Sequence, residues 1–432
     1  MKVRIGIVGY RFARDFSYLF KAHPDVEKIC VAELSEEKRQ IAREDHPDIE
    51  IYNSYDEMLE QSDINCVAIF TQRHLHGPMV MQALRAGKHV YSAVPIGCTI
   101  EEIKEIVALV KETRLIYMMG ETCCYYPAAM FCREKYREGA FGKFVYAEAQ
   151  YYHCTREMYP DYMSNGENWR RKAGIPPMFY PTHSISMILS ALGQHATQVS
   201  CMGYRDDYPD DIFGEDKNDF QNPFSNETAI FRMSGGGVVR INEFRRIGIN
   251  KPSTYITCFY GEDGAYDCIS DKHLLQTVPL ANRDGVVGEM RVTDVSEELL
   301  PINYLKFKRG EIKELRGKSW DDHVSPVDMC LFFGDAAIQK EHMDRIPKSF
   351  LGITTGNHHM SHLFLVDDFV RAVVDNKLPP NNAWDAARYM IPGLVAHESA
   401  LQGGKLLDIP DLGDAPEDWE RLTYEKKDYY NN

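Results

Sequence analysis

Short apolar runs recur through the first third of the chain and are separated by segments of helical composition. Each run is bounded by glycine, proline or polar residues, which is typical of buried strands. We predict strands at residues 3–9, 29–33, 65–70, 89–95 and 115–120, and helices at about 12–21, 79–86 and 100–112. Strands that alternate with helices at this spacing indicate a doubly wound parallel sheet, the α/β class.

The remainder of the chain has a different pattern. Residues 228–233 and 238–243 are two short runs joined by a triple glycine, which predicts a β-hairpin. Residues 364–374 and 383–401 have the apolar spacing of amphipathic helices. A chain of 432 residues exceeds the size at which a single core stops growing. We therefore expect two domains, at residues 1–123 and 124–432.

Composition restricts the class of protein and its partners. Hydrophobic residues make up 44% of the chain and charged residues 26%, as in ordinary globular proteins. The net charge of −15 argues against nucleic acid and against an anionic membrane as partners. The first strand begins at Lys2, which leaves no room for a signal peptide, so we expect a cytoplasmic protein. Eleven irregularly spaced cysteines predict reduced thiols and no metal site.

The first strand ends in a candidate dinucleotide-binding turn. Gly9 occupies the first glycine position of a G-x-G-x-x-G fingerprint, but the second and third glycines are absent. Arg11 and Phe12 follow in the turn, and a guanidinium at Arg11 suits the phosphates of a cofactor. Glu33 ends the second strand, where an acid binds the adenosine ribose and repels a 2′-phosphate. These residues predict NAD rather than NADP.

Tyr180 and His183 are the strongest candidates for catalysis. Pro181 between them is tolerated at the start of a helix, so we predict a helix that begins at Pro181 with Tyr180 as its cap. The two side chains then lie one turn apart, over the same patch. A phenol and an imidazole at one point are suited to moving protons on a hydroxylated substrate. The alternative is a helix start with a packed tyrosine and a hydrogen-bonded histidine.

Two segments resemble a known family. Thr71-Gln72-Arg73-His74-Leu75-His76 resembles the T-P-N-H-x-H segment of the glucose-fructose oxidoreductase/inositol dehydrogenase (Gfo/Idh/MocA) family, and Ala86-Gly87-Lys88-His89-Val90 resembles its A-G-K-H-V segment. The resemblance implies a Rossmann domain followed by an α+β domain with a largely antiparallel, open sheet. It also implies that Thr71, His74 and His76 lie at the cofactor, and that the protein is a homo-oligomer.

The chain departs from the family at its E-K-P tripeptide, which supplies a lysine beside the nicotinamide. Ala93-Val94-Pro95 stands there instead, which leaves Val94 and Pro95 as the cofactor-side residues. The branch of NAD-dependent glycosidases, typified by alpha-N-acetylgalactosaminidases, has E-V-P at this point. The chain is similar to that branch at further segments: Glu121-Thr122-Cys123-Cys124-Tyr125, Tyr152-His153, Tyr180-Pro181-Thr182-His183 and Leu407-Asp408-Ile409-Pro410-Asp411.

The glycosidase resemblance implies a cycle without net oxidation on a sugar or glycoside. Hydride leaves carbon 3, the ketone acidifies the hydrogen on carbon 2, the aglycone is eliminated, water adds and the hydride returns. We expect His183 and Tyr180 to handle the proton of the carbon 3 hydroxyl. His153 would orient the substrate or move a second proton, and Tyr125 would act as the base at carbon 2. Glu121 is expected at the cofactor.

Trp169 and Arg170 lie in a loop rich in glycine and asparagine just before the motif, and suit a sugar face and its hydroxyls; a solvated loop is the alternative. Two other functions remain open for the chain as a whole. One is an NAD-dependent sugar or polyol dehydrogenase with net oxidation, in which Tyr180 and His183 replace the lysine. The other is a non-catalytic NAD-binding protein, which the incomplete glycine fingerprint favours. Sugar identity, anomer and linkage, and the role of residues 251–357, do not follow from the sequence.

Overall fold

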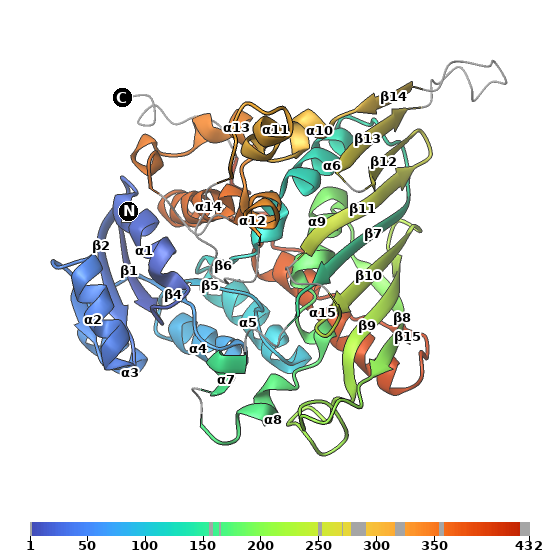
Figure 1. Ribbon diagram of the computed structural model, residues 1–432. Coiled ribbons are helices and arrows are strands. Elements are labelled where there is room, and N and C mark those ends of the chain that lie inside the picture. The colour runs from blue at the N-terminus through green and yellow to red at the C-terminus, as the bar shows by residue number, and fades with distance from the viewer. Residues whose placement is uncertain are drawn as a thin grey trace. The chain divides into compact units, whose positions relative to one another are not determined.

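The protein forms two compact units in a computed structural model, which describes residues 2–154, 159–163, 166–248, 253–269, 271–277, 291–315, 325–353 and 358–423 (Figure 1). Unit 1 consists of Met1–Thr122, Glu341–Met390 and Leu412–Asn432. Unit 2 consists of Cys123–Lys340 and Ile391–Asp411. No helix among the described residues is both long and apolar enough to cross a membrane.

Unit 1 contains a parallel sheet of six strands in the order β3-β2-β1-β4-β5-β6. Its strands are β1 (Val3–Val8), β2 (Val26–Ala32), β3 (Glu50–Tyr52), β4 (Cys66–Ile69), β5 (His89–Ser92) and β6 (Tyr117–Met119). The doubly wound parallel sheet is therefore confirmed. The sequence patterns did not predict β3, since this strand has only three residues and none of them is buried.

Helices cover both faces of this sheet. They are α1 (Ala13–Ala22), α2 (Glu36–Asp45), α3 (Tyr55–Gln61), α4 (Arg73–Arg85), α5 (Ile100–Thr113) and α14 (Ser361–Asp375). Thr99 caps α5, because its hydroxyl accepts the amide of Glu102 at 3.1 Å. Helix α4 begins at Arg73 and not near residue 79 as predicted. Pro78 lies inside it, where the lost amide removes one hydrogen bond without ending the helix.

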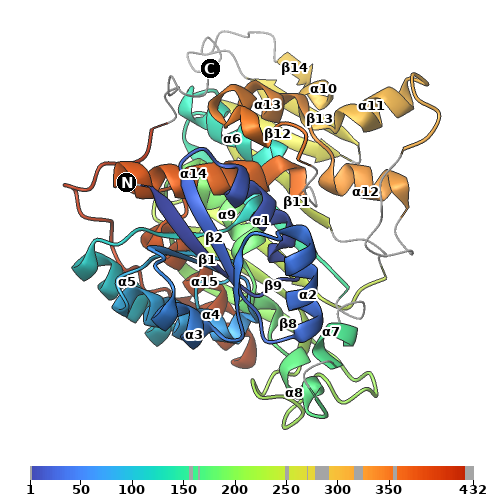
Figure 2. The same cartoon turned by 90° about the vertical axis from the view of Figure 1, so that its left-hand side faces the viewer.

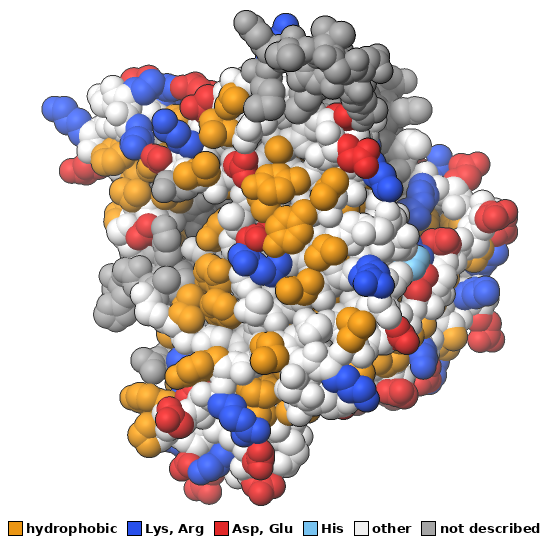
Figure 3. All heavy atoms as spheres, turned by 90° about the vertical axis from the view of Figure 1, so that its right-hand side faces the viewer, with side chains coloured by type: hydrophobic (Ala, Val, Ile, Leu, Met, Phe, Trp, Pro, Cys, Tyr) orange, Lys and Arg blue, Asp and Glu red, His pale blue; other side chains and the backbone are white. Residues whose placement is uncertain are grey.

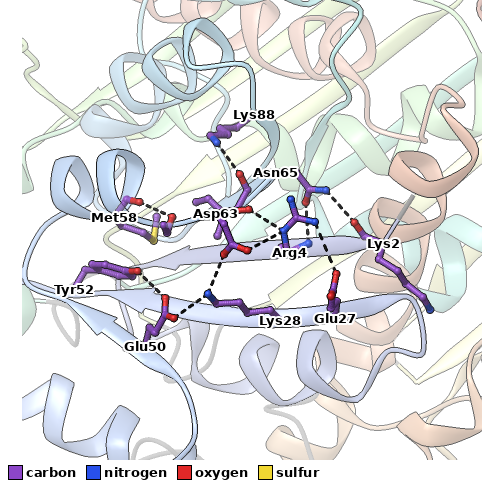
Figure 4. A network of polar contacts seen from close by, with 12 residues as sticks. Lys2, Arg4, Glu27, Lys28, Glu50, Tyr52, Met58, Asp63, Asn65 and Lys88 are labelled. Atoms are coloured by element: carbon purple, nitrogen blue, oxygen red, sulfur yellow. Dashed lines mark hydrogen bonds and ion pairs between the residues drawn. The ribbon is translucent and has the colours of Figure 1, made fainter.

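A polar network fixes the register of β1, β2 and β4 near their amino ends (Figure 4). The Lys28 ammonium lies 2.9 Å from both Glu50 and Asp63. Asn65 pairs with β1, since its side-chain oxygen accepts the Arg4 amide at 2.8 Å. Most of these charges are exposed, so each pair contributes about 1 kcal/mol at most. The carboxyl ends of the same strands lie at the opposite edge of the sheet, and the predicted cofactor residues are located there.

Unit 2 contains a sheet of nine strands in the order β14-β13-β12-β11-β7-β10-β9-β8-β15 (Figure 1). The strands are β7 (Phe144–Tyr152), β8 (Ala196–Arg205), β9 (Phe224–Met233), β10 (Val238–Phe244), β11 (Ser253–Gly261), β12 (Gly264–Ile269), β13 (Lys272–Thr277), β14 (Arg291–Asp294) and β15 (Leu407–Asp408). Only β7 and β10 pair in parallel among the described strands of this sheet. The largely antiparallel sheet and the hairpin of β9 and β10 are both confirmed.

The helices of unit 2 lie mainly against one face of this sheet. Helices α6 (Pro127–Arg137) and α9 (Thr182–Leu192) pack on the central strands, and the last part of α15 (Ala383–Leu401) also belongs to unit 2. The bounds of α15 are those predicted from its apolar spacing. Shorter described helices of unit 2 are α7 (Tyr159–Met163), α8 (Trp169–Ala173), α10 (Ser296–Leu299), α11 (Ile302–Lys308), α12 (Pro326–Phe333) and α13 (Ala337–Glu341).

Candidate functional site

The turn after β1 has the backbone that a dinucleotide needs. Gly9 has a φ of +83°, and a Cβ there would lie 2.8 Å from the carbonyl oxygen of Phe70. Glycine is therefore required at this position both by backbone conformation and by space. Strand order reverses between β1 and β4, so this turn borders the crevice where such sheets bind ligands.

Glu33 lies beside this turn at the end of β2. One of its carboxylate oxygens accepts the backbone amide of Tyr10 at 2.8 Å, and the other accepts the amide of Ser35 at 2.9 Å. The carboxylate is therefore already bound to the glycine turn, and its exposed fraction is 9%. Each oxygen keeps a further lone pair that can accept a ribose hydroxyl, and the ribose contact itself stays a prediction.

The side chains that replace the missing glycines have different surroundings. Arg11 is exposed and Phe12 is 43% exposed. Arg14, at the third glycine position, is bound to Asp45 through two contacts of 2.7 Å. Arg11 is therefore the arginine of this turn that suits a phosphate.

His76 joins two loops at the same edge of the sheet. Its imidazole is buried, with Nδ1 2.9 Å from the carbonyl oxygen of Pro95 and Nε2 3.0 Å from that of Thr71. Burial lowers the pKa of His76, and a neutral ring can donate to only one of these carbonyls. The structure thus places His76 behind the loops that follow β4 and β5, where it positions them.

The other predicted cofactor residues surround these loops. His74 lies half-buried in the first turn of α4, and Val94 is buried in the loop after β5. Glu121 is fully buried, and its backbone carbonyl faces the Asn381 side chain at 3.5 Å. Direct contact of these residues with a cofactor stays a prediction.

On the helix-covered face of the unit 2 sheet, the side chains of three neighbouring strands change from apolar to polar at the same end. Along this face, Tyr151 follows Ala149 on β7, Glu243 follows Ile241 on β10, and Glu227 follows Ala229 on β9 in the reverse direction. Glu243 pairs in register with both Tyr151 and Glu227. These three side chains therefore form one row across the sheet.

Tyr180 and His183 lie over this row. Their ring centroids are 4.9 Å apart with perpendicular planes, and the Tyr151 ring lies 4.9 Å from the same imidazole. The Tyr151 hydroxyl is hydrogen-bonded to Nδ1 of His153. The structure thus brings Tyr180, His183 and His153 together and adds Tyr151, which the sequence patterns did not indicate; the catalytic roles of these residues stay predictions.

The predicted start of the helix is wrong by one residue. Helix α9 begins at Thr182, and Pro181 is its cap. Tyr180 instead ends the preceding 3₁₀ turn, Pro177–Phe179, with a φ of −137°. The physical reason is that the amide of Tyr180 still bonds back to Pro177 at 3.1 Å, so the new helix starts only after the proline.

Arg245, which is paired with Glu243, packs against the rings of Tyr151 and Tyr180. The guanidinium forms an ion pair of 2.6 Å with Glu243 and lies 4.6 Å from the centre of the Tyr151 ring and 6.0 Å from that of Tyr180. The Ser184 hydroxyl also donates to Glu243. Burial raises the pKa of Glu243 to about 7, although Arg245, Ser184 and His183 act in the opposite direction.

Glu227, the second buried carboxylate of the row, binds different partners. It accepts the Met178 amide at 2.9 Å and is 2.7 Å from Nδ1 of His397 on α15. Met178 lies in the 3₁₀ turn before Tyr180. The two glutamates thus anchor the turn and the start of α9 to the sheet, from separate points.

The remaining predicted residues lie elsewhere in unit 2. Tyr125 is buried at the end of a 3₁₀ turn, and its carbonyl accepts the Gln339 amide at 2.9 Å. Trp169 is 7% exposed and packs with Ile212 and Phe213. The Arg170 guanidinium lies 4.6 Å from the indole. The sugar contacts expected of Trp169 and Arg170 stay predictions.

All eleven cysteines are free of disulfides. Seven of the cysteines are buried. Desolvation also raises the pKa of two partly buried thiols, that of Cys98 to about 12 and that of Cys268 to about 11. Cys154 is only partly buried and directly follows His153.

The glycine turn, the reversal of strand order and the acid at the end of β2 define the class of this region, a dinucleotide-binding Rossmann domain. Residues 3–121 match the model of an oxidoreductase family with an NAD-binding Rossmann fold, the Gfo/Idh/MocA family. The predicted resemblance and the NAD-binding nature of this domain are thereby confirmed.

Similar curated proteins carry glycosidase names. The chain is 35% identical over 143 residues to glycosyl hydrolase family 109 protein 2 of Bacteroides fragilis, which is 32% of this chain and 34% of that protein. It is 34% identical over 143 residues to an alpha-N-acetylgalactosaminidase of the same species, with the same coverage. A glycosyl hydrolase family 109 protein of Streptomyces filamentosus is 29% identical over 219 residues, 46% of this chain and 44% of that protein. The matched part spans between a third and a half of these relatives.

Solved structures with the same fold include sugar dehydrogenases. Levoglucosan dehydrogenase in complex with NADH and L-sorbose has a TM-score of 0.67 at 17% identity, over 95% of this chain and 100% of that chain. Scyllo-inositol dehydrogenase from Lactobacillus casei, with NAD(H) and scyllo-inositol bound, has a TM-score of 0.63 at 15% identity, over 94% and 99%. At these identities the similarity establishes the fold alone.

Proposed function

We propose that this protein is an NAD-dependent enzyme that cleaves a glycoside without net oxidation, by transient oxidation at carbon 3 of the sugar. The names of the curated relatives support a glycosidase, and the matched family supports the NAD-binding half. The observation that carries the proposal is the cluster of two phenols and two imidazoles formed by Tyr151, His153, Tyr180 and His183.

The cluster suits a reaction that depends on proton transfers. Hydrolysis by the usual glycosidase route needs two opposed carboxyl groups that reach the sugar. Here the two carboxylates of the row, Glu227 and Glu243, are fully buried and paired with His397 and Arg245. The side chains left for proton work are therefore imidazoles and phenols.

Unit 1 has the residues to hold the cofactor. The Gly9 turn with Arg11 suits the pyrophosphate, Glu33 suits the adenosine ribose, and the loops joined by His76 suit the nicotinamide side. When bound, NAD accepts a hydride from a sugar carbon and returns it. The carboxylate at Glu33 disfavours a 2′-phosphate and thus NADP.

The residues of unit 2 supply the proton chemistry. His183 removes the proton of the carbon 3 hydroxyl, and the Tyr180 ring beside it keeps the imidazole in place. The hydrogen-bonded pair of Tyr151 and His153 forms a second proton carrier, for the hydrogen on carbon 2 or for the leaving group. Arg245 holds both phenols against the sheet. Tyr125 is the alternative base at carbon 2.

The test is the stoichiometry of turnover on an aryl N-acetylgalactosaminide and related aryl glycosides. We expect free aglycone with no net NADH, together with solvent deuterium at carbon 2 of the released sugar. NADH that accumulates one for one with oxidised sugar, without bond cleavage, would contradict the proposal. The His195→Ala variant is the matched control for site variants, because His195 is a partly exposed histidine outside the described cluster.

The second candidate is an NAD-dependent sugar or polyol dehydrogenase. The similarity of the fold to levoglucosan dehydrogenase and scyllo-inositol dehydrogenase favours it. In this case the cluster would replace the family lysine that is absent at Val94. The same assay separates the two candidates, and protein that binds no NAD by calorimetry would favour the non-catalytic alternative.

We also propose that the protein is a cytoplasmic homodimer that pairs through the helix-free face of the unit 2 sheet. Hydrophobic side chains gather across this face in Figure 3. Exposed ones on its strands are Met202, Tyr204, Ile230, Tyr255, Ile269 and Val292. A surface of this kind is typical of an interface. Ile230→Glu should convert a dimer to a monomer in analytical ultracentrifugation, and a wild-type monomer at micromolar concentration would contradict the proposal.

A further inference from the structure

Helices α1 and α14 of unit 1 lie side by side (Figure 2). Near the start of both helices, the His362 ring lies 4.2 Å from that of Phe16. Near the end of α1, His23 contacts Asp367 at 3.2 Å. Because contacts advance together along both helices, the amino end of α14 lies beside the amino end of α1.

Neither helix start is capped by a side chain. Phe12, the N-cap of α1, and Met360, the N-cap of α14, make no capping hydrogen bond through their side chains. The first amides of a helix lack partners within it, and the helix dipole favours negative charge there. Helix α1 already contributes its amino end to the predicted pyrophosphate site, so α14 brings a second one to the same edge of the sheet.

His362, in the first turn of α14, provides an independent observation. Its side chain is 1% exposed, and neither ring nitrogen has a hydrogen-bond partner. Burial lowers the pKa of His362 to about 3, so at neutral pH the ring has one N–H donor and one acceptor. Buried polar groups in native proteins are nearly always paired, and an unpaired one needs an explanation.

Three rings pack around His362, those of Phe16, His358 and Phe12, and Phe12 is part of the glycine turn. The Phe12 ring lies 5.7 Å from the His362 ring and 5.8 Å from that of His358, with nearly perpendicular planes. Phe12 is itself 43% exposed. Movement of this one partly exposed side chain would therefore open His362 toward the turn that receives the cofactor.

We propose that His362 and the amino end of α14 complete the pyrophosphate site of the dinucleotide, with the His362 N–H donated to a phosphate oxygen. This inference rests on the NAD-binding role of unit 1 but does not depend on which reaction follows. The glycine fingerprint has lost the second glycine, which lets the backbone approach the phosphates, and the third, which lets helix and strand pack closely. The amides and imidazole of α14 supply donors from beside the amino end of α1.

The test uses His362→Phe in the full chain, with binding measured by calorimetry and unfolding measured by thermal denaturation without cofactor. Phenylalanine keeps the ring against Phe16 but removes two unpaired polar atoms. The cofactor-free variant should therefore unfold at the same or a higher temperature than the wild type. Its Kd for NAD and for ADP-ribose should both rise about tenfold, the effect of one lost hydrogen bond to a charged group.

His89→Phe is the matched control. His89 is a partly buried histidine at the amino edge of the same sheet, and its Nδ1 accepts the Ile116 amide at 2.9 Å. This variant should lose thermal stability and keep the wild-type Kd. If His362→Phe does not fold, His362→Gln keeps a donor and should bind NAD within about threefold of the wild type.

Three outcomes would overturn the assignment. An unchanged Kd in His362→Phe, with the wild type binding NAD, overturns this inference alone. A loss of affinity for NAD but not for ADP-ribose places His362 at the nicotinamide and also overturns it. A wild-type protein that binds neither ligand overturns the cofactor role of unit 1, and this inference with it.

Discussion

The cofactor edge of unit 1 is formed mainly by backbone, whereas the polar end of the unit 2 sheet is formed by side chains. In unit 1 the backbone conformation of the Gly9 turn defines the predicted phosphate site, and the acid Glu33 accepts one amide of that turn. In unit 2 the site consists of side chains, and two buried glutamates hold them in place. A site made of backbone depends on its conformation, as at Gly9, whereas a site made of side chains depends on each supporting partner.

The largest effect is expected for Arg245→Met, which leaves Glu243 buried without its guanidinium. Loss of one partner of a buried ion pair costs about 3–5 kcal/mol of unfolding free energy, and urea denaturation at pH 8 measures it. Arg240→Met is the control, because its pair with Glu148 is partly exposed and should cost less than about 1 kcal/mol. Equal losses in the two variants would contradict a supporting role for Arg245.

Next comes His183→Ala, which removes the group expected to take the proton of the sugar hydroxyl. Turnover should fall by about 10²–10⁴-fold, the usual contribution of a general acid or base. The Kd for NAD should stay unchanged, since the cofactor residues lie in unit 1. If cofactor binding is lost together with turnover, His183 supports the fold and does not act in catalysis.

A smaller effect is expected for Glu33→Gln, which keeps the shape of the side chain but removes its charge. The ratio of the Kd values for NADP and NAD should fall by about tenfold, because repulsion of the 2′-phosphate is lost. Glu36→Gln, at an exposed site in the first turn of α2, is the control. An unchanged preference would exclude the ribose role of Glu33.

The last prediction concerns the pH dependence of stability. Burial raises the pKa of Glu243 to about 7 from 4.5, so the folded state holds this proton more tightly than the unfolded state. The unfolding free energy contributed by this group is then full below pH 4.5 and falls as the pH rises to 7. Glu243→Gln should remove this slope, and urea titrations between pH 4.5 and 7.5 test it. A slope that persists in the variant would assign it to another group.

Much of the fold follows from the sequence because strands and helices leave local signals. The apolar runs located five of the six strands of unit 1, and the spacing of α15 gave both of its ends. The strand Glu50–Tyr52 was missed because a three-residue strand with no buried residue has no apolar run. Local patterns thus fail where an element is short and half exposed.

The candidate site was only partly predictable, for a related reason. Tyr180, His183 and His153 stand out as residue types in recognisable segments. Tyr151 could have been found from the two-residue period of β7, which places it on the same face as Ala149 and His153. Glu243 could not, because its role depends on the strand register with β7 and on Ser184 of α9.

The partly buried thiol of Cys154 has a practical consequence. Several other thiols of this chain are buried, with raised pKa values that slow alkylation. A fluorophore attached through a maleimide at Cys154 would sit one residue from His153, at the polar end of the unit 2 sheet. The protein therefore contains its own attachment point for an optical probe of the proposed sugar site.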